Sequence, residues 1–95
     1  MTSKQRAMLR SMANTMDSIL YIGKDGIPPA TIQSASAALE ARELIKGCVQ
    51  PECPISAKEA LQTLCEALGA EPVQFIGRRF VMYRPSRNDP RIILE

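Results

Sequence analysis

The stretch Ile19-Leu20-Tyr21-Ile22-Gly23-Lys24-Asp25-Gly26-Ile27-Pro28-Pro29 leads from a short apolar run through a turn flanked by two glycines into a pair of prolines. The apolar run predicts a strand, and the prolines predict a helix start, because proline is tolerated in a first helical turn. Glycine allows a positive φ and a close backbone approach. A strand, such a turn and the unpaired N–H groups of a helix N-terminus together form an anion site, to which Lys24 adds a mobile charge. On this motif alone a plain surface turn is the simpler interpretation.

The length and composition of the chain predict one small domain. We expect the 95 residues to form a single domain over residues 1–86, followed by a C-terminal tail over residues 87–95. The N-terminus lacks the apolar core of a secretory signal, and no apolar run approaches the ~20 residues that span a membrane. Three cysteines without framework spacing argue against a secreted, disulfide-stapled domain. These observations predict a cytoplasmic protein with no membrane partner.

Positive charge gathers at the two ends of the sequence, which favours the binding interpretation of the glycine turn. Residues 1–24 carry four basic side chains and one acidic, whereas residues 25–76 carry three basic and seven acidic. Residues 77–91 carry five basic side chains and one acidic. A fold that brings the two ends together has one basic face, and a clustered basic face is typical of polyanion binding. The alternative is a solvated surface on which both signs are mixed.

Hydrophobic periodicity and capping signals predict three helices and four strands. The first helix is expected over residues 4–15 with Ser3 as N-cap, the second from Pro28 to Arg42, and the third between Ser56 and Gly69. Ser56 and Glu59 form a capping box, and Gly69 occupies the position of a C-terminal glycine cap. Apolar side chains at helical spacing are expected to face the core: Met8, Leu9, Met12 and Met16; Ile32, Ala35 and Leu39; Leu61, Leu64, Cys65 and Leu68.

Strands are expected over residues 19–22, 44–49, 73–76 and 80–83. The order α-β-α-β-α-β-β predicts an α/β (α+β) protein with a mixed four-stranded sheet. The two strand–helix–strand units favour parallel pairing, and the hairpin across Gly77-Arg78-Arg79 must be antiparallel. After Ser86 we expect a tail, in which residues 92–94 are also compatible with pairing at a sheet edge.

The sequence offers little chemistry for catalysis, so we expect neither an enzyme nor a bound cofactor or metal. There is no histidine, which is the commonest general base and zinc ligand. Cys65 lies on the apolar stripe of the third helix, and the spacing of Cys48 and Cys53 matches no usual zinc site. The aromatic residues Tyr21 and Phe75, like the other two on predicted strands, are compatible with base stacking, but we favour a place in the core.

Several segments have a distinctive order and spacing: Ser3-Lys4-Gln5-Arg6, Ile22-Gly23-Lys24-Asp25-Gly26, Ala38-Leu39-Glu40-Ala41-Arg42-Glu43-Leu44-Ile45-Lys46, Leu68-Gly69-Ala70-Glu71, Val73-Gln74, Ile76-Gly77 and Tyr83-Arg84-Pro85-Ser86. Over about 85 residues these segments resemble the CRM (YhbY-like) family of RNA-binding domains. The resemblance implies a mixed four-stranded sheet similar to the C-terminal domain of translation initiation factor three. It also implies association with precursors of the large ribosomal subunit in bacteria.

The resemblance further implies an RNA-binding site. The loop Gly23-Lys24-Asp25-Gly26 is then the backbone clamp, and the first helix is expected beside it. The basic residues expected to contact RNA are Lys4, Arg6, Arg10, Lys24, Arg78, Arg79 and Arg84.

The sequence departs from the usual family pattern in three places. Asp25 stands where asparagine is usual, and residues 14–17 lack the histidines and the basic residue often found there. Both departures predict weaker RNA binding than is usual for the family. Gly47 replaces a β-branched residue in the second strand, where it suggests a bulge or a bend.

Taken together, these features predict a monomeric RNA-binding protein that acts on ribosomal RNA or large-subunit precursors, with no small-molecule substrate. Phosphate contacts would supply most of the affinity. Two alternatives stay open. One is a protein-interaction module that uses the acidic middle or a methionine-rich surface to bind a ribosomal protein. The other is a KH-type RNA-binding domain, although its Gly-x-x-Gly loop joins two helices and here a strand precedes the loop.

Overall fold

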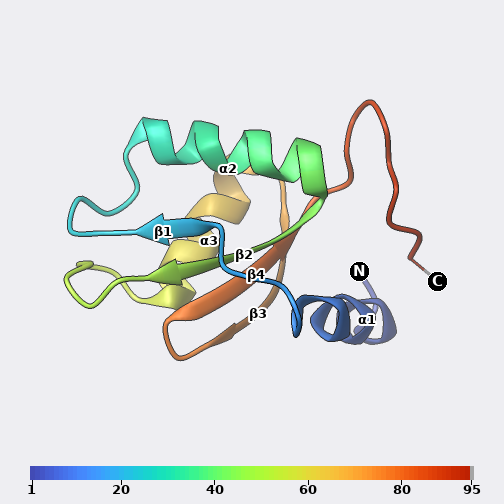
Figure 1. Cartoon of the computed structure of the whole chain (residues 1–95), viewed down its shortest axis with the longest axis horizontal. Helices are drawn as coiled ribbons and strands as arrows, with labels where there is room; N and C mark the ends of the chain where they lie inside the picture. The colour runs from blue at the N-terminus through green and yellow to red at the C-terminus, as the bar shows by residue number, and fades with distance from the viewer. Residues whose placement is uncertain (95) are drawn as a thin grey trace.

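The computed structural model describes residues 1–94 and contains three helices and one four-stranded sheet (Figure 1). In chain order the elements are α1 (Ser3–Ala13), β1 (Leu20–Ile22), α2 (Pro29–Arg42), β2 (Leu44–Val49), α3 (Ala57–Leu68), β3 (Glu71–Ile76) and β4 (Arg79–Tyr83). The α+β class and the predicted order of elements are confirmed, and only the ends of elements shift. In the part of the chain that is described, no helix is both long and apolar enough to cross a bilayer.

The strands are arranged in the order β1-β2-β4-β3. β1 and β2 are parallel and are joined by α2, while β4 is antiparallel to both of its neighbours. The sheet is therefore mixed, as predicted. The second strand–helix–strand unit leaves β3 running in the direction of β2 but not beside it, because β4 lies between them.

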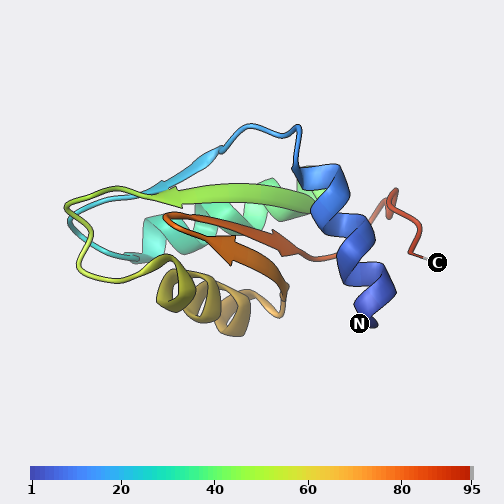
Figure 2. The same ribbon diagram turned by 90° about the horizontal axis from the view of Figure 1, so that it is seen from below.

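The helices leave part of one sheet face uncovered. α2 and α3 lie on the same face (Figures 1 and 2), where Leu39 and Leu64 pack against strand residues such as Ile45 and Phe80. α1 crosses one end of the opposite face, where Leu9 and the other buried residues of α1 form a second cluster with β4. We call the rest of that opposite face, with the side chains of Tyr21, Lys46, Cys48, Gln74, Ile76 and Arg79, the open face.

The N-terminal cap of α1 differs from the prediction. Thr2, not Ser3, is the N-cap: its hydroxyl oxygen accepts from Gln5 N–H at 3.1 Å, and Gln5 Oε1 accepts from Thr2 N–H at 3.0 Å. The expected methionine stripe is also only partly buried, since Met12 is 40% exposed while Leu9 and Ala13 are fully buried. α1 contacts just the end of the sheet, so only a narrow stripe of the helix is covered.

The other two helices follow their sequence signals closely. α2 buries Ala35 and Leu39 as predicted. The capping box of α3 is present, and Gly69 ends that helix in the left-handed conformation with φ 63°. Cys65 is buried in the core, and this burial, together with the charge of Glu71, raises the pKa of its thiol to about 11. A thiol with so high a pKa is unreactive at neutral pH, in keeping with its predicted place in the core.

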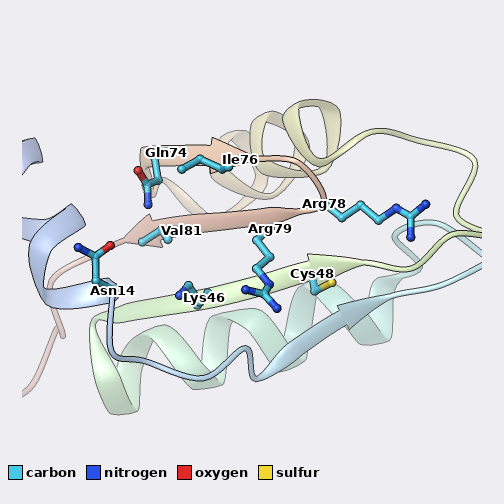
Figure 3. Close-up of a pocket in the computed structure, with 8 residues that line it drawn as sticks. All are labelled: Asn14, Lys46, Cys48, Gln74, Ile76, Arg78, Arg79 and Val81. Atoms are coloured by element: carbon cyan, nitrogen blue, oxygen red, sulfur yellow. The ribbon is translucent and has the colours of Figure 1, made fainter.

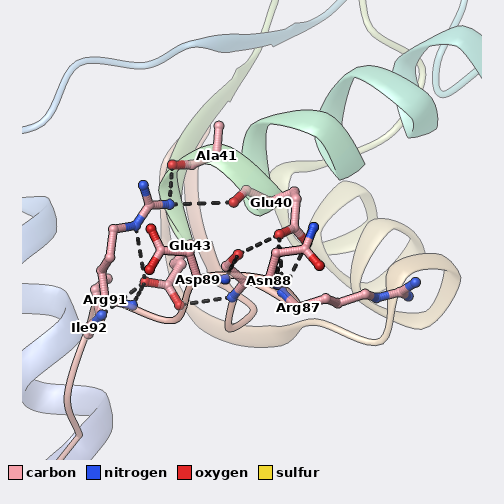
Figure 4. Close-up of polar contacts among 9 residues, drawn as sticks. Glu40, Ala41, Glu43, Arg87, Asn88, Asp89, Arg91 and Ile92 are labelled. Carbon is pink, nitrogen blue, oxygen red and sulfur yellow. Dashed lines mark hydrogen bonds and ion pairs between the residues drawn. The ribbon is translucent and has the colours of Figure 1, made fainter.

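Two carboxylates hold the C-terminal segment against the end of α2 (Figure 4). Glu43 is fully buried with φ 66°, and its carboxylate accepts the N–H groups of Ser86 at 2.8 Å, Arg91 at 2.7 Å and Ile92 at 2.9 Å. Glu40 accepts the Ser86 hydroxyl and the N–H of Arg87. Residues 87–94 thus have no regular secondary structure and no pairing with the sheet edge, yet they are anchored by named hydrogen bonds.

Candidate nucleic-acid interface

The glycine loop, residues 23–26, is a tight turn between β1 and α2. The N–H of Gly26 donates to Gly23 O at 3.0 Å, and Gly26 has φ 67°, a conformation that disfavours other residues. At Gly23 a Cβ atom would lie 3.1 Å from Gln50 Oε1, so a side chain there would crowd the end of β2. Lys24 and Asp25, at the tip, are exposed.

The N–H groups available to an anion near the loop are not the ones that the sequence predicted. Pro28 and Pro29 have no N–H group, and Thr31 N–H donates to Pro28 O at 2.9 Å, so in the first turn of α2 only Ala30 N–H lacks an acceptor among the described residues. Within residues 1–94 the N–H groups of Lys24 and Asp25 also donate to no other group. The prediction of an anion site at the helix N-terminus is therefore corrected: most of the available donors belong to the loop.

The immediate surroundings of the glycine loop are not basic. A shallow depression at the loop is lined by one basic side chain, Lys24, and by the carboxylates of Asp25 and Glu52. Glu52 lies on the loop after β2 and was not singled out from the sequence, because its proximity depends on the parallel pairing of β1 and β2. Backbone donors, rather than net charge, are what this turn can offer a phosphate.

The arginines of the β3–β4 hairpin lie at the same end of the sheet as the glycine loop (Figure 1). Gln50 N–H donates to Ile22 O at 2.8 Å, and Val49 N–H donates to Arg78 O at 2.7 Å. These two bonds join the end of β1, the end of β2 and the hairpin turn in one row. Arg78 and Arg79 are exposed and bring two positive charges to this end.

The basic residues of α1 lie at the other end of the molecule. Figures 1 and 2 show α1 at the start of β1, whereas the glycine loop follows the end of that strand, so the expectation that the two are adjacent is wrong. Lys4 and Arg10 are exposed, and Arg6 Nε donates to Pro72 O at 3.3 Å. The physical reason is that β1 runs away from α1, which places the length of the strand between them.

Arg84 lies inside the molecule. It is only 8% exposed, and its guanidinium donates to Leu68 O and to Ser36 O, each at 3.1 Å. Arg84 therefore links the C-terminal end of α3 to α2. The C-terminal run of arginines is divided in space: Arg78 and Arg79 reach solvent at the hairpin, Arg84 is buried, and Arg91 lies beside Glu43.

Lys46 was not among the candidate binding residues predicted from the sequence, and Tyr21 was predicted to lie in the core. Phe80 and Tyr83 are buried as expected, but Tyr21 is 59% exposed and Phe75 is 48% exposed. The alternation of buried Leu20 and Ile22 around Tyr21 does indicate that the tyrosine faces away from the helices. Whether that face is covered depends on where α1 packs, which the local pattern does not specify.

Comparison with known proteins gives a consistent family. A sequence model described as the CRS1 / YhbY (CRM) domain matches residues 1–84. The chain is 35% identical over 94 residues to the "Probable RNA-binding protein YqeI" of Bacillus subtilis, covering 99% of this chain and 98% of that protein. It is 27% identical over 86 residues to an "RNA-binding protein" of Haemophilus influenzae, covering 90% and 87% of the two chains.

The fold has a similar solved structure. The solution structure of the hypothetical protein SAV1595 from Staphylococcus aureus superimposes with a TM-score of 0.82 and 42% sequence identity. The match covers 100% of this chain and 99% of that one. The similarity therefore extends over the whole described domain, including the glycine loop and the C-terminal segment.

Proposed function

This chain belongs to the CRS1 / YhbY (CRM) domain family, and on that premise we propose that it binds RNA in the bacterial cytoplasm, with ribosomal RNA or precursors of the large ribosomal subunit as its target. The ribosomal target rests on the resemblance set out from the sequence. The RNA-binding function is supported by the names of the two relatives and by the residues at one end of the sheet.

The observation that carries the proposal is the juxtaposition at that end of the sheet. The glycine loop offers the N–H groups of Lys24 and Asp25, which have no acceptor among residues 1–94, and the hairpin places Arg78 and Arg79 at the same end. Backbone N–H groups can bind a phosphate whichever base the nucleotide carries, and arginines add charge and bidentate hydrogen bonds. Such contacts position RNA, while the shape of the RNA would supply selectivity.

Asp25 and Glu52 set a limit on this site. Two carboxylates near a bound phosphate oppose binding, so the loop alone should hold RNA weakly, and the arginines of the hairpin are needed to reverse the sign of the local charge. Lys4, Arg6 and Arg10 would then contact only an RNA long enough to reach α1 at the far end of the sheet. Arg84 is left out of the proposed contact surface because it is buried.

Crosslinking the protein to RNA in cells and sequencing the bound fragments tests the target. The expected result is enrichment of large-subunit ribosomal RNA, including precursor sequences. Capture of a ribosomal protein without crosslinked RNA would support the protein-interaction module instead.

The Lys24→Asp variant tests the loop. It leaves both glycines intact and should weaken RNA binding about fivefold or more, because like charges at short range oppose the phosphate. Arg42→Asp, the same charge change at the other end of α2, is the matched control. RNA affinity and melting temperature are measured on the same preparations. A Lys24→Asp protein that melts normally and binds RNA at full strength would remove the loop from the site.

A further inference from the structure

The open face of the sheet is a broad, shallow surface that is separate from the glycine loop. Figure 3 shows its side chains on β2, β3 and β4, with α2 and α3 behind the sheet. They line a depression of about 480 Å³, within the range of small-ligand sites. Tyr21 of β1 lies on the same face, beside Lys46, Cys48 and Arg79.

Strand register places the residues of the open face in two rows. Tyr21 lies opposite Cys48, Cys48 opposite Arg79, and Arg79 opposite Ile76, so one row crosses all four strands. In the second row Lys46 lies opposite Val81, which in turn lies opposite Gln74. Neighbouring strands are about 4.8 Å apart, so the backbones at Tyr21 and Arg79 are separated by roughly 10 Å. The small side chain of Cys48 lies between them.

Tyr21 is an aromatic ring that is both exposed and held in place. Its side chain is 59% exposed, yet its hydroxyl donates to Ser18 O at 3.0 Å. Tyr83, the other tyrosine, is only 6% exposed. Because the hydrogen bond already restrains Tyr21, stacking on its ring costs little further side-chain entropy, which favours a base-stacking platform.

The charge of the open face is positive. Arg78 and Arg79 make no ion pair within residues 1–94, where the ion pair that forms is between Arg91 and Glu43. Lys46 Nζ donates to Met16 O at 3.2 Å, which uses one of its three N–H groups. Asp17 is the carboxylate at the rim beside Tyr21. Lys46 and Arg79 on the open face, with Arg78 at the adjoining hairpin turn, outnumber this one carboxylate and favour a polyanion.

We infer that the open face binds unpaired nucleotides of RNA, with a base stacked on Tyr21 and neighbouring phosphates bound by Arg79 and Lys46. Bases in a duplex have no exposed ring face, so stacking selects single-stranded RNA or a loop. This inference rests on the proposed RNA-binding function and adds the kind of RNA segment and the side chains that recognise it.

The chain provides its own optical reporter for this contact. It has two tyrosines and no tryptophan, so Tyr83→Phe leaves Tyr21 as the single strong intrinsic fluorophore. Titration of Tyr83→Phe with a single-stranded oligouridylate should quench this fluorescence in proportion to binding, because the base stacks on the ring. A perfect RNA duplex of the same length, bound through its phosphates, should leave the fluorescence largely unchanged.

Affinity measurements with variants complete the test. Tyr21→Leu should weaken single-strand binding by about 5- to 150-fold, which corresponds to the 1–3 kcal/mol of a stacked base. Tyr21→Phe, which keeps the ring, should bind nearly as the wild type does, and Arg79→Gln should bind more weakly. Phe75→Leu and Lys58→Gln are matched controls, because both residues are exposed but line a depression on the helix side of β3. Normal melting temperatures are required of each variant.

The outcomes separate the inference from the proposed function. If the wild-type protein binds no RNA, both are overturned. If it binds single-stranded RNA while Tyr21 stays unquenched and Tyr21→Leu binds at full strength, RNA binding survives and the open-face inference fails. Quenching together with loss of affinity in Tyr21→Leu and Arg79→Gln, but not in the controls, supports it.

Discussion

Gly47 of β2 lies directly opposite Phe80 of β4, and the Phe80 ring fills the space that a side chain at position 47 would occupy. A Cβ atom built on Gly47 would be 2.3 Å from Phe80 Cζ, far inside van der Waals contact. Both residues are buried on the side of the sheet that α2 and α3 cover. The absent side chain and the large ring therefore form one complementary pair in the core.

Gly47→Ala should destabilise the protein by about 1–3 kcal/mol, because the added methyl group forces the ring out of its position. Reducing the ring with Phe80→Leu should recover part of that loss in the double variant, so the two changes should couple by about 0.5–3 kcal/mol. Urea denaturation of the wild type, both single variants and the double variant measures the coupling. Strictly additive losses of stability would show that the packing of the Phe80 ring does not depend on the missing side chain at Gly47.

The same pair shows what the sequence pattern does not specify. Gly47 suggested a bulge or a bend in the second strand, and the bulge is contradicted: β2 pairs with β4 in an unbroken register through Gly47. The irregularity lies in β3 instead, between Pro72 and Gln74, on an edge strand where proline is tolerated. A glycine in a strand indicates that something approaches closely, but the identity of the neighbour depends on strand order.

Arg84→Lys should destabilise the protein without touching its RNA site. Lysine cannot donate to Leu68 O and Ser36 O in the forked geometry of the guanidinium, so a loss of about 1–3 kcal/mol is expected. The melting temperature is measured by thermal unfolding, and RNA affinity is measured at a temperature well below the melting transition. A variant that melts normally but loses RNA affinity would show that Arg84 contacts the RNA after all.

Stability should fall in acid because of the carboxylates that hold the C-terminal segment. Burial opposes ionisation of Glu43, but the backbone N–H groups of Ser86, Ile92 and Arg91 outweigh it, so the pKa of this carboxyl lies below its ordinary value of 4.5. The hydroxyl of Ser86, followed by the N–H of Arg87, likewise lowers the pKa of Glu40. A lowered pKa contributes stability that is fully present above about pH 4.5 and is lost as the pH falls through the folded-state pKa.

Glu43→Gln tests this assignment. It should cost on the order of 2 kcal/mol at neutral pH, because an amide is a weaker acceptor for buried N–H groups than a carboxylate is. As the pH falls below the ordinary pKa of 4.5, the difference from the wild type should narrow, since the stability that the wild-type carboxylate contributes is then progressively lost. Urea midpoints measured from pH 7 to pH 3 give both quantities. A constant difference across this range would contradict the role given to Glu43.

Asp25→Asn should tighten RNA binding. It removes a negative charge beside the proposed phosphate position and keeps a side chain that suits a turn. At exposed positions about 4 Å apart the effect is about 1 kcal/mol, or roughly fivefold in affinity, and stability should change by less than about 0.5 kcal/mol. Filter binding measures the change in RNA affinity, and thermal melting measures the change in stability. Weaker binding would mean that the carboxylate makes a specific contact, for example with a ribose 2′-hydroxyl.

Local signals in the sequence were sufficient for the elements but not for the whole site. The capping box at Ser56 and Glu59 predicts α3 correctly, and residues 44–49 form the predicted strand β2, because such signals depend on neighbouring residues. Arg84 and Lys46 lie in short segments whose surroundings are made by distant parts of the chain. Burial of Arg84 needs the ends of two helices, and the partial exposure of Lys46 depends on the position of α1. Counting charge along the sequence therefore assigned Arg84 to the RNA-binding surface, where it does not lie, and missed Lys46 on the open face.

The salt dependence of RNA affinity tests the central claim most directly. If Lys24, Lys46, Arg78 and Arg79 each neutralise a phosphate of single-stranded RNA, log K should fall against log salt with a slope of about −3. Arg79→Gln should flatten the slope by about 0.7, and Lys58→Gln on α3 should leave it unchanged. A slope near zero for the wild-type protein, or one that Arg79→Gln does not alter, would contradict binding of RNA phosphates by the glycine loop, the hairpin arginines and the open face.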